Sequence, residues 1–469
     1  MTSAKLIFIA ISTILFIILP FFIKNVRQYF LAMASSLYVF STGWIFYHFN
    51  GLMLADLPIL GLLALSLFSG RHIKWILHPV TLPLLGFIVW GLVSSFAAVV
   101  PGWCISESTK YLRMYLLIVV LVHNIRSMDD LRVVVNSMIG VLLVQVFIGI
   151  YQWRFGAVGL WFLGERAASR IAWRSMGTFF VPSFYANYLA MVLPVAFRLF
   201  IFYKAPNRKH VVLYGAALLF GVLALFSTYG RGPWVGFGFA IVILTLLSFL
   251  KGRFRPRLNW AIPVLIFFSL LFVQRYGSKV IGQFQQRMVS YEVRFPQFRL
   301  ARRVISQNQM LGVGLGNYEL VAINYMNERE RADTMARIHA SMVHNSYYLV
   351  TAEMGLPGGF FLILWFVSIF WSGYRIIQSK MYNPFIVNTA MGVLGGMAAI
   401  VVVFTFSPDV HSYQIQYQIS LFSGILLAET QLMKNAAARK RLMEMSKKQA
   451  FPEGKTSQSI DRTMSNQLS

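Results

Sequence analysis

Residues 211–250 read VVLYGAALLFGVLALFSTYGRGPWVGFGFAIVILTLLSFL. The apolar runs 211–228 and 232–250 each have the length that an α-helix needs to cross roughly 30 Å of hydrocarbon. Between the two runs, a short turn carries Arg231 with a glycine on either side. The stretch therefore predicts a pair of membrane-spanning helices joined by a charged turn at the membrane surface.

The same apolar character extends along the whole chain. Hydrophobic residues make up 57% of the 469 residues and charged residues only 12%, which excludes an ordinary soluble domain. We expect an all-α polytopic membrane protein, a bundle of about 12–13 transmembrane helices with one long outer (periplasmic) loop. The apolar runs that are long enough to span a membrane lie at 5–23, 29–48, 51–69, 80–100, 108–124, 131–153, 184–203, 211–228, 232–250, 258–275, 346–376, 386–406 and 414–432.

The positions of the lysines and arginines indicate the topology. A net charge of +26 could suggest nucleic acid, but basic residues in a membrane protein first mark the cytoplasmic connectors, so we expect no nucleic-acid partner. The basic connectors and the basic tail fall on one side if the spans alternate. This pattern predicts a cytoplasmic C-terminus. The single cysteine, Cys104, excludes a disulfide within the chain and a cysteine-rich metal site.

Two longer segments between the apolar runs, about 154–183 and 276–343, contain no run able to cross a bilayer. Both fall on the outer side, and we expect the working parts of the protein there. The predicted division is a transmembrane bundle of ten helices over 1–275, an outer arginine-rich loop over 276–343, the last transmembrane helices over 344–433, and a basic cytoplasmic tail, disordered in part, over 434–469.

The outer segments are rich in arginine and nearly free of lysine. Arginine presents a planar fork of donors that grips phosphate oxygens in bidentate fashion, whereas lysine offers only a point charge. The cluster therefore predicts an anionic, phosphate-bearing ligand. The alternative is that the arginines contact lipid headgroups or pair with local acids. They are Arg154, Arg166, Arg170, Arg174, Arg231, Arg287, Arg294, Arg299, Arg302, Arg303, Arg329, Arg331 and Arg337.

The turn STYGRGPW at 227–234 is the most specific of the local motifs. Glycines on both sides of Arg231 let a ligand approach the guanidinium closely, and Pro233 suits the first turn of the next helix. A charge at a turn between two spans costs little energy, so position alone does not establish a function.

A second motif, HNSYY at 344–348, is followed by EMGLPGG at 353–359. Asn345 or Ser346 can cap the helix that begins there. His344 could act as a general base, although a single histidine at such a place is more often a hydrogen-bonded interface residue. A third motif, GVGLG at 312–316, lacks the strand and helix of a dinucleotide site and predicts a flexible outer turn.

Taken in this order, the motifs resemble those of the O-antigen ligase and O-antigen polymerase superfamily of bacterial membrane glycosyltransferases. The chain departs from the family at Ser183, where many relatives have asparagine, and at Gln309, where a proline often precedes the glycine-rich turn. The matching elements are RSMGTF at 174–179 leading to Pro182, STYGRG at 227–232, Arg294 before GVGLG at 312–316, and HNS at 344–346 with Glu353 and Gly355.

The resemblance implies transfer of a glycan from an undecaprenyl-diphosphate carrier to an acceptor hydroxyl at the outer face of the bacterial cytoplasmic membrane. It implies a metal-independent inverting enzyme without a cofactor, acting as an O-antigen ligase or as a polymerase of a surface polysaccharide. The expected partners are the lipid-linked donor, a lipid or glycan acceptor, membrane lipids and other proteins of envelope polysaccharide assembly.

By matching motif, Arg231 and Arg294 would bind the diphosphate and stabilise it as the leaving group, and His344 would take the proton of the acceptor. We therefore predict these three as catalytic residues. The predicted substrate-binding residues are Arg174, Arg299, Arg302, Arg303 and Glu353.

A transporter or flippase of a lipid-linked oligosaccharide is the alternative, and a membrane scaffold is a third hypothesis. A transporter should carry charged residues inside its spans, along a path through the bilayer. Here they are scarce, and most charge lies at the outer rim, which favours chemistry at the surface. The charged residues in or near the spans are Asp56, Glu107, Lys110, Arg113 and Arg198.

Overall fold

The computed structural model describes residues 25–40, 55–69, 77–155, 174–179, 181–250, 274, 288–332, 343–379 and 383–450. Within these residues the chain consists of helices joined by turns, and no strand occurs. The helices are α2 (Val26–Ser36), η1 (Leu37–Phe40), α3 (Asp56–Phe68), α4 (Thr81–Val93), η2 (Ser94–Ala97), α5 (Pro101–Asn124), α6 (Met128–Phe155), α8 (Pro182–Ile201), α9 (Arg208–Ser227), α10 (Arg231–Leu250), α12 (Met288–Gln307), α13 (Tyr318–Val321), η5 (Ala322–Tyr325), α14 (Glu328–Ala332), α16 (Ser346–Gln378), α17 (Pro384–Val403), η6 (Asp409–His411) and α18 (Tyr413–Ala450).

Six of the described helices are long and apolar enough to cross a membrane, namely α6, α8, α9, α10, α16 and α17. This confirms an all-α polytopic membrane protein. The predicted run 5–23 and, apart from residue 274, the run 258–275 lie outside the described residues, as do 41–48 of the run 29–48 and 51–54 of the run 51–69. The described parts of the other predicted runs are mostly helical. The total of about 12–13 spans stays a prediction.

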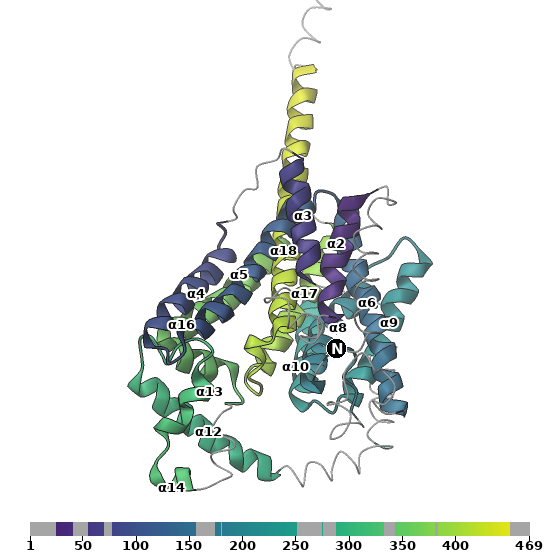
Figure 1. The fold of residues 1–469 in the computed structure, drawn as a ribbon. Helices are drawn as coiled ribbons and strands as arrows, with labels where there is room; N and C mark the ends of the chain where they lie inside the picture. The colour runs from purple at the N-terminus through teal and green to yellow at the C-terminus, as the bar shows by residue number, and fades with distance from the viewer. Residues whose placement is uncertain are drawn as a thin grey trace, which may run out of the picture.

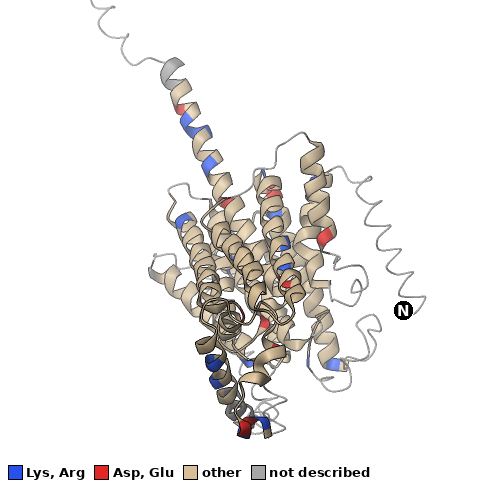
Figure 2. Ribbon diagram, turned by 60° about the vertical axis from the view of Figure 1, so that its left-hand side comes forward, with Lys and Arg blue, Asp and Glu red and all other residues tan. Residues whose placement is uncertain are grey.

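The two ends of the bundle differ in charge and in structure. Helices α12, α13 and α14 lie together at one end, which we term the loop end, and α18 continues past the bundle at the other (Figure 1). Lysines and arginines colour the projecting part of α18 and the helices of the loop end, whereas the helices between them are mostly tan with isolated blue and red segments (Figure 2). The membrane-embedded part is therefore the apolar middle of the bundle.

Helices α8 and α17 form the centre of the bundle, and most of each helix is buried. Glycines of α17 allow the two backbones to approach closely. A Cβ at Gly396 would lie 2.1 Å from the carbonyl oxygen of Met191, and one at Gly392 would lie 2.6 Å from the Cα of Val195. Small residues at such a contact supply the van der Waals packing that drives helix association in lipid.

Helix α16 is broken at Gly355, whose φ of 68° lies in the left-handed region. A break in a membrane helix leaves backbone groups without partners, and lipid cannot satisfy them. Here the carbonyls of residues 352–354 accept hydrogen bonds from the backbone N–H groups of Val313 and Gly314 and from the indole of Trp90, at 2.8–3.0 Å. The turn at 312–316 thus supplies hydrogen-bond donors to carbonyls that the break in α16 leaves without partners inside the helix.

Glycine is required on both sides of this contact. A Cβ at Gly312, where φ is 67°, would lie 2.3 Å from the backbone carbonyl of Glu353. A Cβ at Gly355 would lie 2.2 Å from the carbonyl oxygen of Met310. The GVGLG motif at 312–316 is therefore packed tightly on α16 and is not the flexible turn that the sequence suggested.

We expect Gly312→Ala to lower the free energy of unfolding by about 2–4 kcal/mol, because the alanine would be strained at this φ and would overlap the backbone of α16. Gly140→Ala is the matched control, since nothing lies within 4 Å of a Cβ there, and it should change stability by less than about 1 kcal/mol. Equilibrium unfolding of the detergent-solubilised protein measures both. Equal stability of the two variants would contradict the proposed role of the glycine turn.

Candidate functional site

The turn between α17 and α18, residues 404–412, holds the start of α16. The backbone N–H and the hydroxyl of Ser346 donate to carbonyl oxygens of this turn at 2.9 and 2.6 Å, and the Asn345 amide donates to another at 3.2 Å. The Asn345 side chain also caps α16 by accepting from the N–H of Tyr348 at 3.0 Å. The segment that carries His344 is therefore held both by the α17–α18 turn and by the cap on α16.

The arginine turn, residues 227–234 between α9 and α10, also lies against the α17–α18 turn. The Arg174 guanidinium donates from Nε to the carbonyl oxygen of Thr228 at 2.7 Å, so two of the predicted motifs are in direct contact. Arg231 is the first residue of α10 and is half-buried. A Cβ at the next residue, Gly232, would lie 3.5 Å from the Cβ of Phe406. Both the arginine turn and the start of α16 thus lie against the α17–α18 turn.

Tyr229 marks the arginine turn as strained. Its φ is 53°, and among the residues that the structure describes it is the non-glycine residue with a positive φ. This conformation is uncommon for a bulky side chain and persists only where the surroundings impose it, often at functional sites. Here the ring is buried, so packing fixes the backbone that presents Gly230 and Arg231.

His344 is linked to α12 through Gln297. Its Nδ1 lies 3.0 Å from Oε1 of Gln297, a residue that is buried on α12. When the imidazole is neutral and Nδ1 donates to this oxygen, Nε2 is the unprotonated nitrogen. A general base requires that tautomer, so the contact orients His344 for the role that the sequence predicted.

The predicted arginines of α12 have different surroundings. Arg294 lies on α12 less than one turn before Gln297. Arg299 is exposed, and Arg302 donates from Nε to the hydroxyl of Tyr348 at 3.0 Å. Together with Arg303, four of the predicted arginines thus lie on the helix that contacts His344.

Arg303, the fourth predicted arginine on α12, faces the short helices beyond it. It donates to Oε2 of Glu330 at 2.9 Å and to the carbonyl oxygen of Tyr325 at 2.5 Å. The hydrogen bond from Arg303 lowers the pKa of Glu330. Arg303 therefore fastens α14 to α12, and its guanidinium is already engaged by protein groups.

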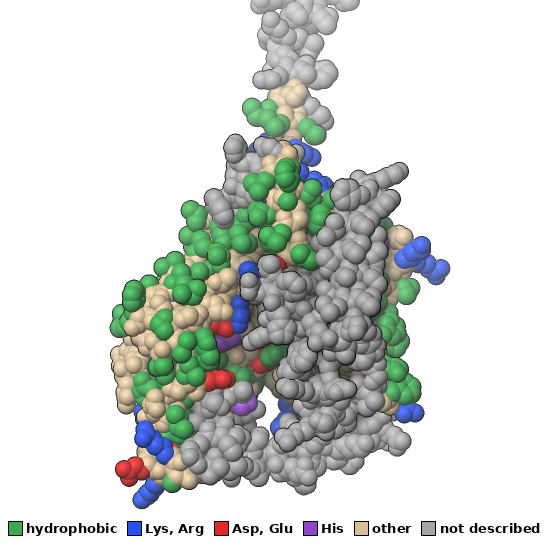
Figure 3. Space-filling view, in the orientation of Figure 1, with side chains coloured by type: hydrophobic (Ala, Val, Ile, Leu, Met, Phe, Trp, Pro, Cys, Tyr) green, Lys and Arg blue, Asp and Glu red, His purple; other side chains and the backbone are tan. Residues whose placement is uncertain are grey.

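Glu353 is buried and pairs with a histidine that the sequence analysis did not select. Nε2 of His411 lies 2.8 Å from Oε2 of Glu353. On its other side, Nδ1 of His411 lies 3.3 Å from the hydroxyl of Tyr111 and 4.0 Å from a carboxylate oxygen of Glu107, which in turn contacts Lys110. Figure 3 shows acidic, basic and histidine side chains gathered in the middle of one face, between apolar ones.

The electrostatics of this cluster favour a charged histidine. Burial by itself would lower the pKa of His411, but the carboxylates of Glu353 and Glu107 outweigh burial, and the net effect is a raised pKa. For Glu319, burial first and then the charge of Glu353 raise the pKa of the carboxyl. The cluster therefore holds the carboxylates of Glu353 and Glu107 beside one imidazole, with the Glu319 carboxyl within electrostatic range of Glu353.

A second pair of polar residues that the sequence analysis did not select involves the α17–α18 turn, residues 404–412. Asn187, on α8, donates from its side-chain amide to Oδ2 of Asp409 at 2.5 Å, and both residues are buried. Burial raises the pKa of the Asp409 carboxyl. The signal in the sequence is the polar stretch SPDVHS at 407–412, which separates two spans at the loop end. The α17–α18 turn thus contributes ionisable groups as well as backbone contacts.

Comparison with known proteins adds one finding. Residues 215–363, about a third of the chain, match the family described as O-antigen ligase. The matched region includes the arginine turn, α12, the glycine turn and His344. No curated protein matches the chain. The family match confirms the resemblance to the O-antigen ligase and polymerase superfamily that the motifs indicated.

We expect Glu353→Gln to lower the unfolding temperature at acidic pH and to have a smaller effect at alkaline pH. Because Glu353 raises the pKa of His411, the stabilisation is fully present below the ordinary imidazole pKa and is lost as the pH rises through the raised one. Unfolding temperatures at about pH 6 and about pH 9 test this.

Glu330→Gln is the control for that measurement. The pKa of Glu330 is lowered, so its stabilisation is present above the ordinary glutamate pKa and is constant between about pH 6 and pH 9. An effect of Glu353→Gln that stays equally large over this range would show that the charge of His411 does not contribute.

Proposed function

Because the chain carries an O-antigen ligase domain over residues 215–363, we propose that it transfers a glycan from an undecaprenyl-diphosphate carrier to an acceptor hydroxyl at the outer face of the bacterial cytoplasmic membrane. The acceptor is a lipid, for a ligase, or the end of a growing glycan, for a polymerase. Membrane lipids surround the enzyme, and other envelope polysaccharide assembly proteins supply the donor.

One observation carries this proposal beyond the family match. The arginine turn and the start of α16 both lie against residues 404–412, and these contacts support a site that includes Arg231 and His344. Gln297 brings α12, with Arg294, to the same histidine. A cationic group for a diphosphate and a base for a hydroxyl are the two parts that glycosyl transfer needs.

The proposed reaction is a single displacement. The acceptor oxygen forms a bond to the anomeric carbon, while the bond from that carbon to the diphosphate oxygen breaks and the diphosphate leaves with the electron pair. Nε2 of His344 takes the acceptor proton. Arg231 and Arg294 stabilise the departing diphosphate, and one well-placed donor of this kind contributes about 3 kcal/mol to lowering the barrier. A single displacement inverts the anomeric centre, and arginines supply the positive charge without a metal ion.

The membrane topology follows from charge. The exposed basic residues of α18 beyond the bundle favour a cytoplasmic C-terminus by the positive-inside rule, which places the loop end outside. We infer that the predicted division into a bundle over 1–275, an outer arginine-rich loop over 276–343, a second bundle part over 344–433 and a basic tail over 434–469 describes the working arrangement.

Charged groups buried in the bundle make structural contacts in this arrangement. Arg198 donates to Ser248 at 2.5 Å and to Asn388 at 2.8 Å, and Asp56 pairs with Arg113 at 3.4 Å. Groups engaged in this way stabilise the packing of helices. They favour an enzyme over a transporter or flippase.

We expect Arg231→Ala and His344→Ala each to lower the rate of glycan transfer on the order of 100- to 1,000-fold, because each removes a group that acts in the transition state. Transfer by membranes containing the purified variant, with a labelled lipid-linked donor, measures the rate. Arg132→Ala is the control, since this exposed arginine lies at the opposite end of the bundle, where it pairs with an exposed carboxylate and lies over the ring of Phe385. Full activity of both loop-end variants would refute the proposed site.

Deletion of the gene should change the lipid-linked glycans of the host in a way that separates the reactions. For a ligase, long chains on the diphosphate carrier should accumulate at the outer face, and for a polymerase, single repeat units should accumulate there. Extraction of carrier lipids and their sizing on each membrane face gives the result. Repeat units trapped at the cytoplasmic face would instead support a flippase.

A further inference from the structure

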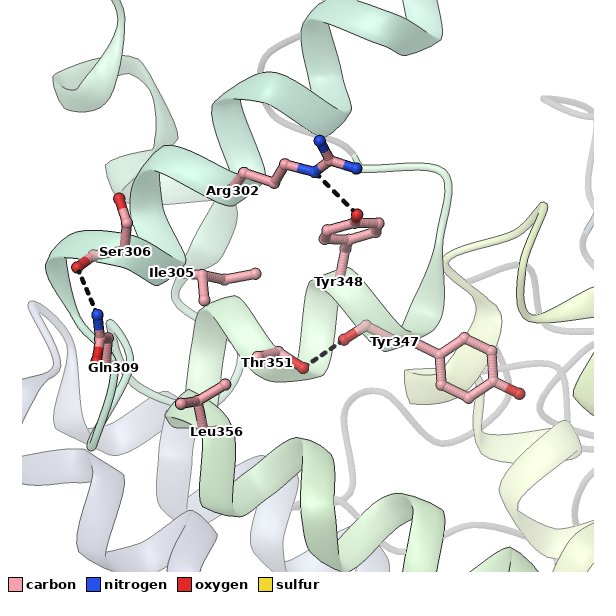
Figure 4. Close-up of a pocket in the computed structure, with 8 residues that line it drawn as sticks. All are labelled: Arg302, Ile305, Ser306, Gln309, Tyr347, Tyr348, Thr351 and Leu356. Carbon is pink, nitrogen blue, oxygen red and sulfur yellow. Dashed lines mark hydrogen bonds between the residues drawn. The ribbon is translucent and has the colours of Figure 1, made fainter.

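An open groove with a cavity volume of about 450 Å³ lies between α12 and the first part of α16. Figure 4 shows Arg302 over Tyr348 at one end of it and Leu356 at the other. Its volume is in the range of small-molecule sites, about 300–1,000 Å³. The lining residues are Arg302, Ile305, Ser306, Gln309, Tyr347, Tyr348, Thr351 and Leu356. One cation, several polar groups and no carboxylate among them suit an anionic headgroup.

Arg302 is held in place by an aromatic pair. Its Nε donates to the Tyr348 hydroxyl, and the guanidinium carbon lies 5.7 Å from the centre of the Tyr348 ring. Tyr348 stacks on Phe298, with ring centres 5.6 Å apart. The two terminal nitrogens of Arg302 have no hydrogen-bond partner among the described residues. A positioned guanidinium with available N–H groups is the geometry that binds a phosphate in bidentate fashion.

An exposed apolar stripe leads away from the cavity along α16. It begins at Leu356, which also lines the cavity, and ends at Trp371 and Tyr374. At 1.5 Å per residue its length is about 27 Å, close to the thickness of the hydrocarbon core. Aromatic residues at its far end match the membrane interface. The stripe consists of Leu356, Phe360, Ile363, Val367, Trp371 and Tyr374.

The stripe fixes the depth of the cavity. Leu356 is the first exposed apolar residue of the stripe, so the cavity beside it lies at one end of the apolar surface of α16, where lipid headgroups are expected. A ligand with an anionic head at Arg302 and a long apolar chain on α16 therefore fits both surfaces at once. An amphiphile with a phosphate head is the chemical class with these two properties.

We propose that this groove binds the lipid carrier of the donor, with a phosphate on Arg302 and the first part of its chain along Leu356, Phe360 and Ile363. This inference rests on the proposed function. Two features favour the carrier over a bulk phospholipid: Tyr347 and Tyr348 follow His344 closely in the chain, and Gln297, which contacts His344, lies on the same helix as Arg302. The groove is therefore lined by the two segments that carry or contact the candidate base.

Photocrosslinking tests the position of the chain. A benzophenone amino acid replaces Phe360 or, as the control, Phe239, an exposed phenylalanine on the spanning helix α10. Irradiation of membranes supplied with a polyprenyl-diphosphate-linked radiolabelled glycan should label the protein from position 360 at least about tenfold more than from 239. Labelling by phospholipid alone at 360, or equal glycan labelling at both positions, would overturn the proposal.

Kinetics test the head of the groove. Arg302→Gln should raise the donor concentration for half-maximal rate about tenfold while kcat changes little, because it removes the bidentate, charge-assisted hydrogen bonds to the bound donor. Leu356→Trp, which fills the cavity, should act in the same direction. The controls are Arg132→Gln on α6 and Val242→Trp on α10, both at exposed positions.

Different results would refute the lipid-binding groove and the proposed glycan transfer. Unchanged kinetics of Arg302→Gln and Leu356→Trp, together with inactive Arg231→Ala and His344→Ala variants, would refute the groove and leave the proposed function standing. Full activity of the Arg231 and His344 variants would refute the proposed function itself.

Discussion

The hydrogen bonds between the start of α16 and residues 404–412 are the contacts on which the loop end depends. They use the backbone and side chain of Ser346 and the side chain of Asn345. Gly232 packs against the same turn from α10, and His411 at its far end meets Glu353. Hydrophobic burial contributes little to the choice of helix neighbours in lipid, so satisfied polar contacts of this kind specify which helix ends meet.

The break in α16 at Gly355 gives one helix two roles. Before the break, residues 346–354 contact α12, the glycine turn and the α17–α18 turn. After it, residues 356–374 expose an apolar stripe of the length of the hydrocarbon core. An unbroken helix could satisfy its own carbonyls, but it would leave no acceptors for the turn at 312–316. The structure of α16 at its break therefore depends on the glycines of that turn, although they lie outside the helix.

The spans could be predicted from the sequence because they depend on length and apolar character alone. The arginine turn at 227–234 and the cap at Asn345 were also predictable, since both are local. Contacts between distant segments were not. The GVGLG motif gave no sign that it would meet a helix break some 40 residues later, and the stretch SPDVHS at 407–412 resembles any polar connector. Its importance follows only from the neighbours that the fold provides.

The loop end is electrostatically two-sided. Arginines gather on α12, and Arg231 begins α10, whereas Glu353 and Glu107 lie beside His411 and Glu319 lies within electrostatic range of Glu353. Carboxylates repel a diphosphate and accept hydrogen bonds from hydroxyl groups, and guanidinium groups have the opposite preferences. Under the proposed function, the donor diphosphate is therefore directed to the arginine side and sugar hydroxyls to the carboxylate side. His344, joined to α12 by Gln297 and to the α17–α18 turn by its neighbours, belongs to the segment that links the two sides.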